Sequence, residues 1–525
     1  MTRPPPATRY EVHFGQRLVR CFADRPNDVD ALLRDAVARW PDRTALVLGD
    51  AELTYRDLDA SVTSIAANLM ARGLAPGDRI AILLGNGFAF VKMVLAAARA
   101  GLIVVPMNVL QRSPETAFVL NQCAAKALVF DAACAPNLPA DRETPSVAHW
   151  FIVGEGQGTP FAELERAASA SFPTLDEESV FCLLYTSGTT GKPKGAMLSH
   201  LGTVHSALHF ADRFDLMHND VAALAVPASH VTGLVAIILT MIRAGGATVI
   251  MPAFKARNFL EIAEMRGMTY TLIVPAMYNL CLLEPEFGDF DLSAWRIAGF
   301  GGAPMPEATI TGLAKTLPGL SLRNAYGSTE TTSPATLMAL GDINISPASV
   351  GRALPCADVL IMRDDGVEAE PGEAGELLIG GPMVVEGYWD NPEANSASFI
   401  GGYWVSGDIG SKDADGFVYV FDRKKDMVNR AGYKVYCIEV ESTLSLHNAV
   451  IECAVIGVPD PVLGEKTHIF IHAHADHPDA GGIRSWCAER LSKYKVPDLV
   501  TFLDGPLPRN ANGKILKTAL RDQSA

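Results

Sequence analysis

The first hundred residues alternate between two spacings of apolar side chains. Helical spacing, with apolar residues three and four apart, occurs in three stretches: 28–40, 57–72 and 88–100. Short apolar runs that predict buried strands lie between and after them: 44–48, 80–84 and 103–106. Strand, helix and strand at this pitch are typical of a mostly parallel sheet covered by helices. The same alternation returns between Val221 and Val274, so we expect layered α/β sheets.

The pattern changes after about residue 340. Residues 340–421 are rich in glycine, proline and short alternating strands, which indicates a β-rich subdomain. A charged stretch at 422–426 then precedes a region of mixed helix and strand pattern. Charged residues between two patterned regions suit a hinge. We therefore expect an α/β fold with a large N-terminal domain, 1–424, and a small mobile α+β C-terminal domain, 425–525.

The composition is that of a globular protein. The chain has 525 residues, and at roughly 100–200 residues per domain this length predicts two to four units. Hydrophobic residues make up 49% and charged residues 20%, which excludes wholesale disorder. The longest apolar run, Val231–Ile242, has 12 residues. A membrane span needs about 20, so we expect a buried helix there and no membrane span.

The charge balance and the cysteines restrict the function classes. There are 44 Lys and Arg against 59 Asp and Glu, a net charge of −15, which argues against nucleic-acid binding because phosphate backbones require a basic surface. Binding of a small anion in a locally basic pocket remains compatible with this charge. The nine cysteines are scattered singly without CxxC spacing, which predicts reduced thiols and a cytoplasmic location. Met1–Arg9 is Pro-rich and polar and does not resemble a secretory signal.

The most informative segment is 185–195, Tyr-Thr-Ser-Gly-Thr-Thr-Gly-Lys-Pro-Lys-Gly, after an apolar strand-like run. Glycines allow backbone N–H groups to turn toward phosphate oxygens, hydroxyls add donors, and the two lysines offset charge. The GxxxxGK[ST] spacing of a P-loop is absent. A flexible surface loop is the alternative for a generic stretch of this composition. The full string instead predicts a cradle for a polyphosphate.

With this segment the sequence resembles the adenylate-forming superfamily, which comprises acyl- and aryl-CoA synthetases, luciferases and the adenylation domains of peptide synthetases. Further matching motifs follow in the family's order: 227–233, 301–304, 326–330, 403–408, 423–426, 432–434 and 508–514. The resemblance covers the chain from about Asp28 to its end and is greatest to acyl-CoA synthetases.

The resemblance implies an ATP-dependent carboxylic acid:CoA ligase with two half-reactions. A carboxylate and MgATP give acyl-AMP and pyrophosphate, and the thiol of coenzyme A then displaces AMP. ATP, Mg²⁺ and coenzyme A are the implied cofactors and co-substrates. The residues that match the family's ATP- and AMP-binding positions are Thr186, Ser187, Gly188, Thr189, Thr190, Gly191, Lys192, Lys194, Gly302, Ala303, Pro304, Asn324, Ala325, Tyr326, Gly327, Thr329, Asp408, Arg423 and Lys514.

The resemblance also implies individual roles, which the chemistry of each side chain supports. Tyr326 would lie on the purine face, and Asn324 would bind its amino group. Glu330 would hold Mg²⁺, a hard cation that prefers oxygen ligands. Asp408 can accept from both ribose hydroxyls. The matching catalytic positions are Lys514, Thr186, His230 and Glu330.

Lys514 matches the family's catalytic lysine. Its ammonium group would orient the carboxylate and the α-phosphate and stabilise the charge that develops between them. Lys425 matches the pivot of domain rotation, and Gly432, Tyr433 and Lys434 match the face that meets coenzyme A.

Candidate acyl-pocket residues are small or apolar and include no lysine or arginine: His230, Val231, Ala276, Met277, Gly301, Gly302 and Gly327. A second carboxylate on the substrate would lack a partner, and burying it unpaired is costly. We therefore expect an aryl or medium-chain monocarboxylate. Three residues depart from the family pattern: Ser229 where an aromatic is frequent, Asp422 where glycine is usual, and Cys437 where proline is common.

Alternatives share parts of this pattern. A stand-alone adenylating enzyme would load the acyl group onto the pantetheine of a carrier protein. A non-catalytic nucleotide sensor would be expected to lack Lys514 or Glu330, and both are present. An oxygenase of luciferase type has the same fold. The expected partners are a small carboxylic acid, ATP and coenzyme A, and a homodimer is the candidate assembly.

Overall fold

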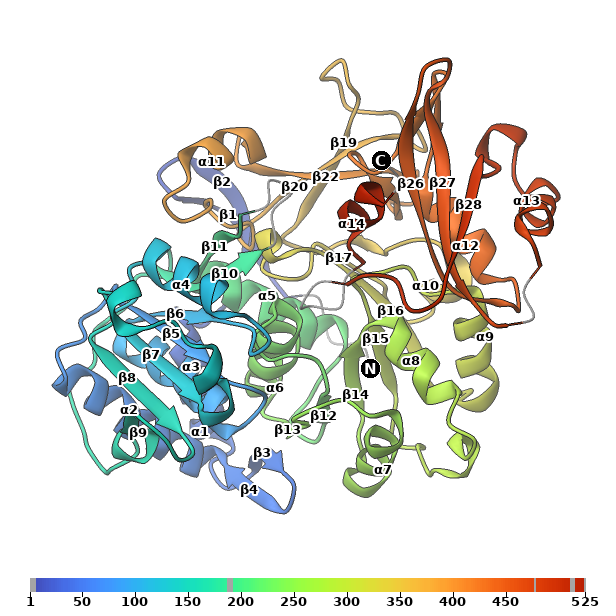
Figure 1. Ribbon diagram of the computed structural model, residues 1–525. Coiled ribbons are helices and arrows are strands. Elements are labelled where there is room, and N and C mark those ends of the chain that lie inside the picture. Colours follow the sequence, from blue (N-terminus) through green and yellow to red (C-terminus); the bar gives the residue numbers. More distant parts are fainter. Residues whose placement is uncertain (1–5, 187–191, 476–477, 510–514, 524–525) are drawn as a thin grey trace. The chain divides into compact units, whose positions relative to one another are not determined.

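The computed structural model describes residues 6–186, 192–475, 478–509 and 515–523 (Figure 1). The chain divides into two compact units. The first contains residues 1–303, 313–359 and 379–405, and the second contains residues 304–312, 360–378 and 406–525. Among the described residues no helix combines the length and the hydropathy needed to cross a membrane.

A seven-stranded sheet lies in the first unit. Its order is β11 (Lys194–Ser199), β10 (Val180–Thr186), β6 (Ile103–Pro106), β5 (Arg79–Leu83), β7 (Ala127–Asp131), β8 (His149–Val153) and β9 (Thr159–Pro160). All neighbours run parallel except β10 and β11, which are antiparallel. Its inner strands are almost wholly apolar, as expected for parallel strands buried on both faces.

A nine-stranded sheet also lies in the first unit. Its order is β18 (Arg352–Ala353), β17 (Thr336–Leu337), β16 (Ser321–Tyr326), β15 (Ile297–Phe300), β14 (Tyr270–Ile273), β12 (Val221–Leu224), β13 (Ala247–Ile250), β3 (Thr44–Leu48) and β4 (Ala51–Thr54). The six strands from β16 to β3 run parallel to one another, whereas β17 pairs antiparallel with β16 and β18, and β4 pairs antiparallel with β3. The two sheets confirm the layered α/β architecture expected from the sequence.

The helices that precede the C-terminal sheet in the chain are α1 (Val29–Arg39), α2 (Tyr55–Ala71), α3 (Phe88–Ala100), α4 (Ser113–Gln122), α5 (His200–Arg213), α6 (Thr240–Ala244), α7 (Ala256–Arg266), α8 (Pro275–Leu282), α9 (Glu307–Thr316), α10 (Asp342–Ile345) and α11 (Pro392–Ser398). The three helices predicted near the N-terminus are confirmed, α3 to the residue. Asp28 begins α1 by accepting the N–H of Ala31 at 2.7 Å, which satisfies an otherwise unpaired donor.

The apolar run at 231–242 forms a buried helix, as expected, but its first part is a π-helix over Thr232–Leu239. A π-helix is rare and is found mostly near functional sites. This one begins two residues after His230.

The N-terminal segment forms a hairpin that the sequence reading did not predict. Strands β1 (Thr8–His13) and β2 (Arg17–Phe22) pair antiparallel in a sheet of their own. We call residues 8–22 the N-terminal hairpin.

The β-rich region contains β19 (Asp358–Met362), β20 (Gly375–Gly380), β21 (Phe399–Ile400), β22 (Tyr403–Lys412) and β23 (Val418–Arg423), joined in one sheet. The C-terminal sheet has the order β25 (Tyr433–Val435), β24 (Val428–Arg430), β27 (Gly464–Ala473) and β26 (Val450–Asp460), with β28 (Leu499–Leu503) paired to β27. Its two faces bury different sets of side chains. One packs on α12 (Cys437–Ser445) and α13 (Ala480–Ala488), and the other on α14 (Lys517–Asp522).

Two of the residues that depart from the family pattern contact each other in the second unit. The buried carboxylate of Asp422 on β23 accepts the backbone N–H of Cys437, at the start of α12. Burial raises the pKa of Asp422 to about 6, against the opposing effects of Lys517 and of hydrogen bonds from the backbone of Cys437 and Arg423. The structure therefore holds a carboxyl group that titrates above the ordinary range of aspartate.

Replacing Asp422 with Asn is expected to remove a pH-dependent part of the stability. Because the folded pKa of Asp422 is raised, the folded chain keeps a proton that the unfolded chain releases between about pH 4 and pH 6. The contribution of Asp422 to the free energy of unfolding should thus fall as the pH rises through this window, by up to ~1.4 kcal/mol per pH unit. Thermal unfolding of wild type and Asp422→Asn from pH 4.5 to 7 measures it. A difference between the two proteins that does not change with pH would contradict the assignment.

Candidate active site

Four neighbouring parallel strands of the nine-stranded sheet, β12, β14, β15 and β16, end at the same edge. The candidate residues follow these strands in the chain: His230 and Val231 after β12, Ala276 and Met277 after β14, Gly301, Gly302 and Ala303 after β15, and Gly327, Thr329 and Glu330 after β16. Ligands of open α/β sheets bind outside the carboxyl ends of the strands. The structure thus gathers the candidate acyl and adenine residues at the edge where ligands are expected. Pro304 belongs to the second compact unit.

At two positions of this edge, neighbouring backbone lies so close that only glycine fits. A Cβ on Gly301 would lie 2.4 Å from the carbonyl oxygen of Ala325, and one on Gly327 would lie 1.5 Å from that of Ser333. No side chain fits at either position without moving the neighbouring backbone. The chain just after β15 is therefore packed against β16, and the loop after β16 is packed against itself, while Gly302 and Ala303 remain exposed.

The two candidate adenine contacts from β16 differ in burial. Asn324 is buried, and its amide nitrogen is 3.5 Å from the carbonyl oxygen of Ser349. Tyr326, two residues on, is half-buried and ends the strand. Phe300 of β15 is the register partner of Asn324, so Gly301 and Ala325 are the next residues on the two strands.

Glu330 is buried, with 6% of its surface exposed. Its Oε1 accepts from the hydroxyl of Tyr388 at 2.9 Å, and its Oε2 accepts from the hydroxyl of Ser328. No lysine or arginine forms an ion pair with it among the residues the structure describes. The donor set of hard oxygens fits Mg²⁺, and a cation would neutralise a carboxylate that hydroxyl groups alone leave charged.

The backbone after Glu330 is strained. Thr332 and Ser333 have φ of 50° and 96°, in a region that residues other than glycine rarely adopt. Such conformations persist only where surrounding contacts hold them, and they are frequent at ligand sites. Here the hydroxyl of Thr332 donates to the carbonyl of Met383 at 2.7 Å.

Tyr388 joins this site although the sequence reading did not include it. Besides its bond to Glu330, its ring lies 5.1 Å from the ammonium nitrogen of Lys194. The backbone around it pairs with β11. The N–H of Met197 donates to the carbonyl of Gly387 at 3.0 Å, and that of Trp389 donates to Gly195 at 2.8 Å. The Gly-Tyr-Trp string at 387–389 was the available sequence signal.

The predicted phosphate loop connects the antiparallel strands β10 and β11, where Thr186 is the register partner of Lys194. It is therefore the connection of a hairpin, unlike the strand-to-helix turn of a P-loop. Thr186 and Lys194 are half-buried and Lys192 is exposed. The predicted residues Ser187, Gly188, Thr189, Thr190 and Gly191 lie outside the described residues.

His230 is exposed by its accessible surface, yet burial lowers its pKa. Together these properties indicate that protein surrounds most of the ring, although water still reaches part of it. Its Nδ1 lies 3.3 Å from the backbone nitrogen of Thr232 and 3.1 Å from the hydroxyl oxygen of the same residue. Val231 is buried, whereas Ala276 is exposed and Met277 half-buried.

The second unit holds the other candidates. The guanidinium of Arg423 contacts the buried carboxylate of Asp408 at 2.7 Å, because the two residues are register partners on β22 and β23. Lys425 is exposed. Lys514 lies outside the described residues.

The candidate face for coenzyme A is the turn between β24 and β25. Ala431 and Gly432 form this turn with φ of 52° and 87°, as the tight turns of hairpins require. Tyr433 is exposed and stacks on Tyr494 with ring centroids 4.8 Å apart. Lys434 is exposed and its ammonium group lies 3.6 Å from the carboxylate of Asp364.

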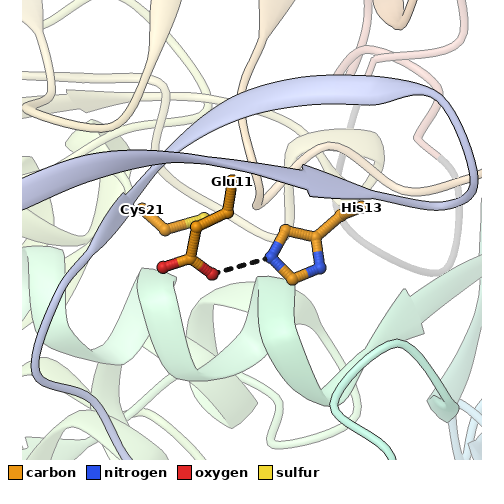
Figure 2. Close-up of side chains that lie close together, drawn as sticks. All are labelled: Glu11, His13 and Cys21. Carbon is orange, nitrogen blue, oxygen red and sulfur yellow. Dashed lines mark hydrogen bonds and ion pairs between the residues drawn. The ribbon is translucent and has the colours of Figure 1, made fainter.

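Metal-ligand side chains also meet on the N-terminal hairpin, where Glu11, His13 and Cys21 lie close together (Figure 2). The carboxylate of Glu11 accepts from both terminal nitrogens of the Arg25 guanidinium, at 2.9 and 2.7 Å, and from Arg9 at 2.7 Å. These contacts lower the pKa of Glu11, while burial raises that of Cys21 to about 12. Two guanidinium groups already contact the only carboxylate of these three residues, and their positive charge disfavours the binding of a metal cation. We therefore interpret the cluster as part of a set of ion pairs.

Comparisons with known proteins agree with this geometry. Residues 33–389 match the family model of the AMP-binding enzymes, and residues 439–514 match that of the AMP-binding enzyme C-terminal domain. A long-chain-fatty-acid–CoA ligase of Mycobacterium tuberculosis is 35% identical over 481 residues, which are 90% of this chain and 93% of the relative.

Solved structures are similar along nearly the whole chain. An anthranilate CoA ligase in complex with anthranoyl-AMP has a TM-score of 0.88 and 27% identity, covering 95% of this chain and 98% of its own. The o-succinylbenzoate coenzyme A synthetase of Bacillus subtilis, in complex with ATP and a magnesium ion, has a TM-score of 0.82 and 30% identity, covering 94% and 98%.

Tyr388→Phe is expected to weaken divalent-cation binding about tenfold, because partners of metal-binding groups commonly contribute 10- to 100-fold to affinity. The change removes one hydroxyl and keeps the ring. Electron paramagnetic resonance can measure Mn²⁺ binding in the presence of a non-hydrolysable ATP analogue. Tyr403→Phe, which removes an exposed hydroxyl that donates to Asp358 at 2.5 Å, is the matched control. Unchanged Mn²⁺ affinity in Tyr388→Phe would show that the Tyr388 hydroxyl does not contribute to cation binding.

Proposed function

The chain belongs to the AMP-binding family of adenylate-forming enzymes and is an AMP-forming acyl-CoA synthetase, and from this premise we propose that it joins an aryl or medium-chain monocarboxylic acid to coenzyme A. The observation that carries the proposal is the gathering of uncharged candidate pocket residues at the carboxyl ends of β12, β14, β15 and β16, beside the buried Glu330.

The first half-reaction joins two anions. The substrate carboxylate attacks the α-phosphorus of ATP and pyrophosphate leaves, so that acyl-AMP forms. Tyr326 and Asn324 would hold the adenine, and Asp408 with Arg423 the ribose hydroxyls. Thr186, Lys192 and Lys194 would bind the phosphates, and Thr329 the α-phosphate. Mg²⁺ bound by Glu330 would neutralise phosphate charge.

The second half-reaction transfers the acyl group to sulfur. The thiol of coenzyme A attacks the acyl carbon and AMP leaves with the electron pair of the broken carbon–oxygen bond. We propose Lys425 as the pivot that brings Gly432, Tyr433 and Lys434 toward coenzyme A. We also propose that His230 lies at the inner end of the channel through which the pantetheine arm of coenzyme A would enter.

The preference for a monocarboxylate follows from charge. The candidate pocket residues His230, Ala276, Met277 and Gly301 carry no fixed positive charge, so a second carboxylate would be buried without a partner. A solved relative bound to anthranoyl-AMP supports an aryl acid, and a relative named for long-chain fatty acids supports an uncharged aliphatic tail without indicating its length.

A panel of carboxylic acids tests the proposal. Acid-dependent pyrophosphate release, measured with benzoates, cinnamates, six- to twelve-carbon fatty acids and dicarboxylates, should be fastest for acids with uncharged tails. Addition of coenzyme A should then yield AMP and a thioester. Preference for a dicarboxylate by tenfold or more would overturn the substrate class. Thioester formation on a pantetheinylated carrier protein, but not on coenzyme A, would replace the proposed acceptor.

Lys514→Ala should lower acyl-adenylate formation by about two to three orders of magnitude, the usual loss when one preorganised charge-stabilising donor is removed. Lys514 would act only in the first half-reaction, so thioester formation from preformed acyl-AMP should be retained. Rapid-quench measurement of each half-reaction separates the two effects. Equal losses in both would contradict this division of labour.

A further inference from the structure

The N-terminal hairpin, residues 8–22, precedes the region that matches the family model, which begins at residue 33. It nevertheless contacts two later parts of the chain, the segment just before β10 and residues 384–386. One contact is made by Arg17 at the start of β2, and the other by His13 at the end of β1 together with Arg25 just after the hairpin.

Arg17 binds three consecutive backbone carbonyls far away in the sequence. Its guanidinium donates to Val384 at 3.3 Å, to Val385 at 3.1 Å and to Glu386 at 3.0 Å. Burial lowers the pKa of Arg17, but a guanidinium stays protonated. Charge-assisted bonds from a planar group are strong and directional, so Arg17 fixes the path of this short segment.

The same segment holds Glu330. The N–H of Val385 donates to the backbone carbonyl of Glu330 at 2.9 Å, and the hydroxyl of Tyr388 donates to its side chain at 2.9 Å. Two residues after Glu330, the hydroxyl of Thr332 donates to the carbonyl of Met383 at 2.7 Å. Residues 383–388 thus contact the backbone before the strained turn, the turn itself and the carboxylate.

The second attachment is a buried ionic cluster. The Arg25 guanidinium bridges Glu11 of the hairpin and Glu177, which it contacts at 2.9 and 3.0 Å. The ring of His13 contacts Glu11 at 3.1 Å, a contact drawn in Figure 2, and its other nitrogen contacts Glu178 at 2.9 Å. Arg25 and His13 have side chains only 8% and 7% exposed. Glu177 and Glu178 lie just before β10, the strand that ends at Thr186.

We propose that Arg17 is a positioning residue for the divalent cation at Glu330, and that the N-terminal hairpin fixes Glu330 relative to the strands that carry the phosphate loop. The inference rests on the proposed function, because that function gives Glu330 its cation. Arg17 would act on the cation only through residues 384–386, whose carbonyls its guanidinium binds.

Arg17→Met tests the proposal, because methionine keeps an unbranched apolar side chain and removes every donor. Mn²⁺ affinity in the presence of a non-hydrolysable ATP analogue, measured by electron paramagnetic resonance, should fall about three- to tenfold, at or below the low end of the range for direct partners of metal-binding groups. Arg20→Met is the matched control on the same hairpin. Its exposed guanidinium donates only to the hydroxyl of Tyr10, at 2.8 Å, among the hydrogen bonds of the described chain.

Hydrogen exchange supplies a readout that needs neither cation nor catalysis. Peptides that contain residues 383–388 and 328–333 should exchange faster in Arg17→Met than in wild type, and at the wild-type rate in Arg20→Met. Arg17→Lys keeps the charge and part of the donor capacity, so its affinity and exchange should lie between those of wild type and Arg17→Met. If Arg17→Met does not fold, the same measurements on Arg17→Lys decide the question.

Wild-type Mn²⁺ affinity in a folded Arg17→Met protein would overturn the proposal, as would an equal loss in Arg20→Met. A purely stabilising role would lower the unfolding temperature without changing Mn²⁺ affinity, and this outcome also contradicts it. If no acid supports pyrophosphate release by the wild type, the ligase proposal fails. The exchange rates and the affinity for the Mn²⁺–nucleotide complex would still decide the role of Arg17.

Discussion

A buried carboxylate without a cationic partner in the described chain is the central constraint on this structure. Hydroxyl groups of Tyr388 and Ser328 satisfy the lone pairs of Glu330, but they do not offset its charge. A charge in a low-dielectric interior is costly unless a counter-charge lies near it. If Glu330 holds the proposed cation, the surrounding backbone has to fix the position of its carboxylate.

Two sheets share this control. The nine-stranded sheet supplies Glu330 and the candidate adenine and acyl residues from the ends of parallel strands, and the seven-stranded sheet supplies the hairpin that carries the phosphate loop. Tyr388 lies where the two meet, with its hydroxyl on Glu330 and its ring near Lys194. Because both contacts come from one side chain, a shift of the phosphate-loop strands relative to Glu330 cannot occur without loss of at least one of them.

The sequence predicted those parts of the fold and site that depend on local pattern. Helix α3 and strands β3 and β6 were located to the residue, because apolar spacing determines which face of an element is buried. The candidate residues of the strand ends came from ordered motifs. The N-terminal hairpin was missed because the apolar side chains of β1, Tyr10 and Val12, are exposed, and only β2 buries apolar residues. The role of Arg17 could not be predicted, since its partners are more than 360 residues away.

The two departures from the family pattern at 422 and 437 also show that a contact between residues cannot be predicted from each residue alone. Taken one at a time, an aspartate where glycine is usual and a cysteine where proline is common have no evident connection. In the structure the Asp422 carboxylate accepts the N–H of Cys437, which a proline could not donate. The bond therefore requires the carboxylate at 422 and a residue other than proline at 437. It also joins the chain before Lys425 to the chain after it, within one compact unit. If Lys425 is the pivot, any rotation that separates β23 from α12 has to break this buried bond, so the pair would set part of the free-energy difference between the two arrangements.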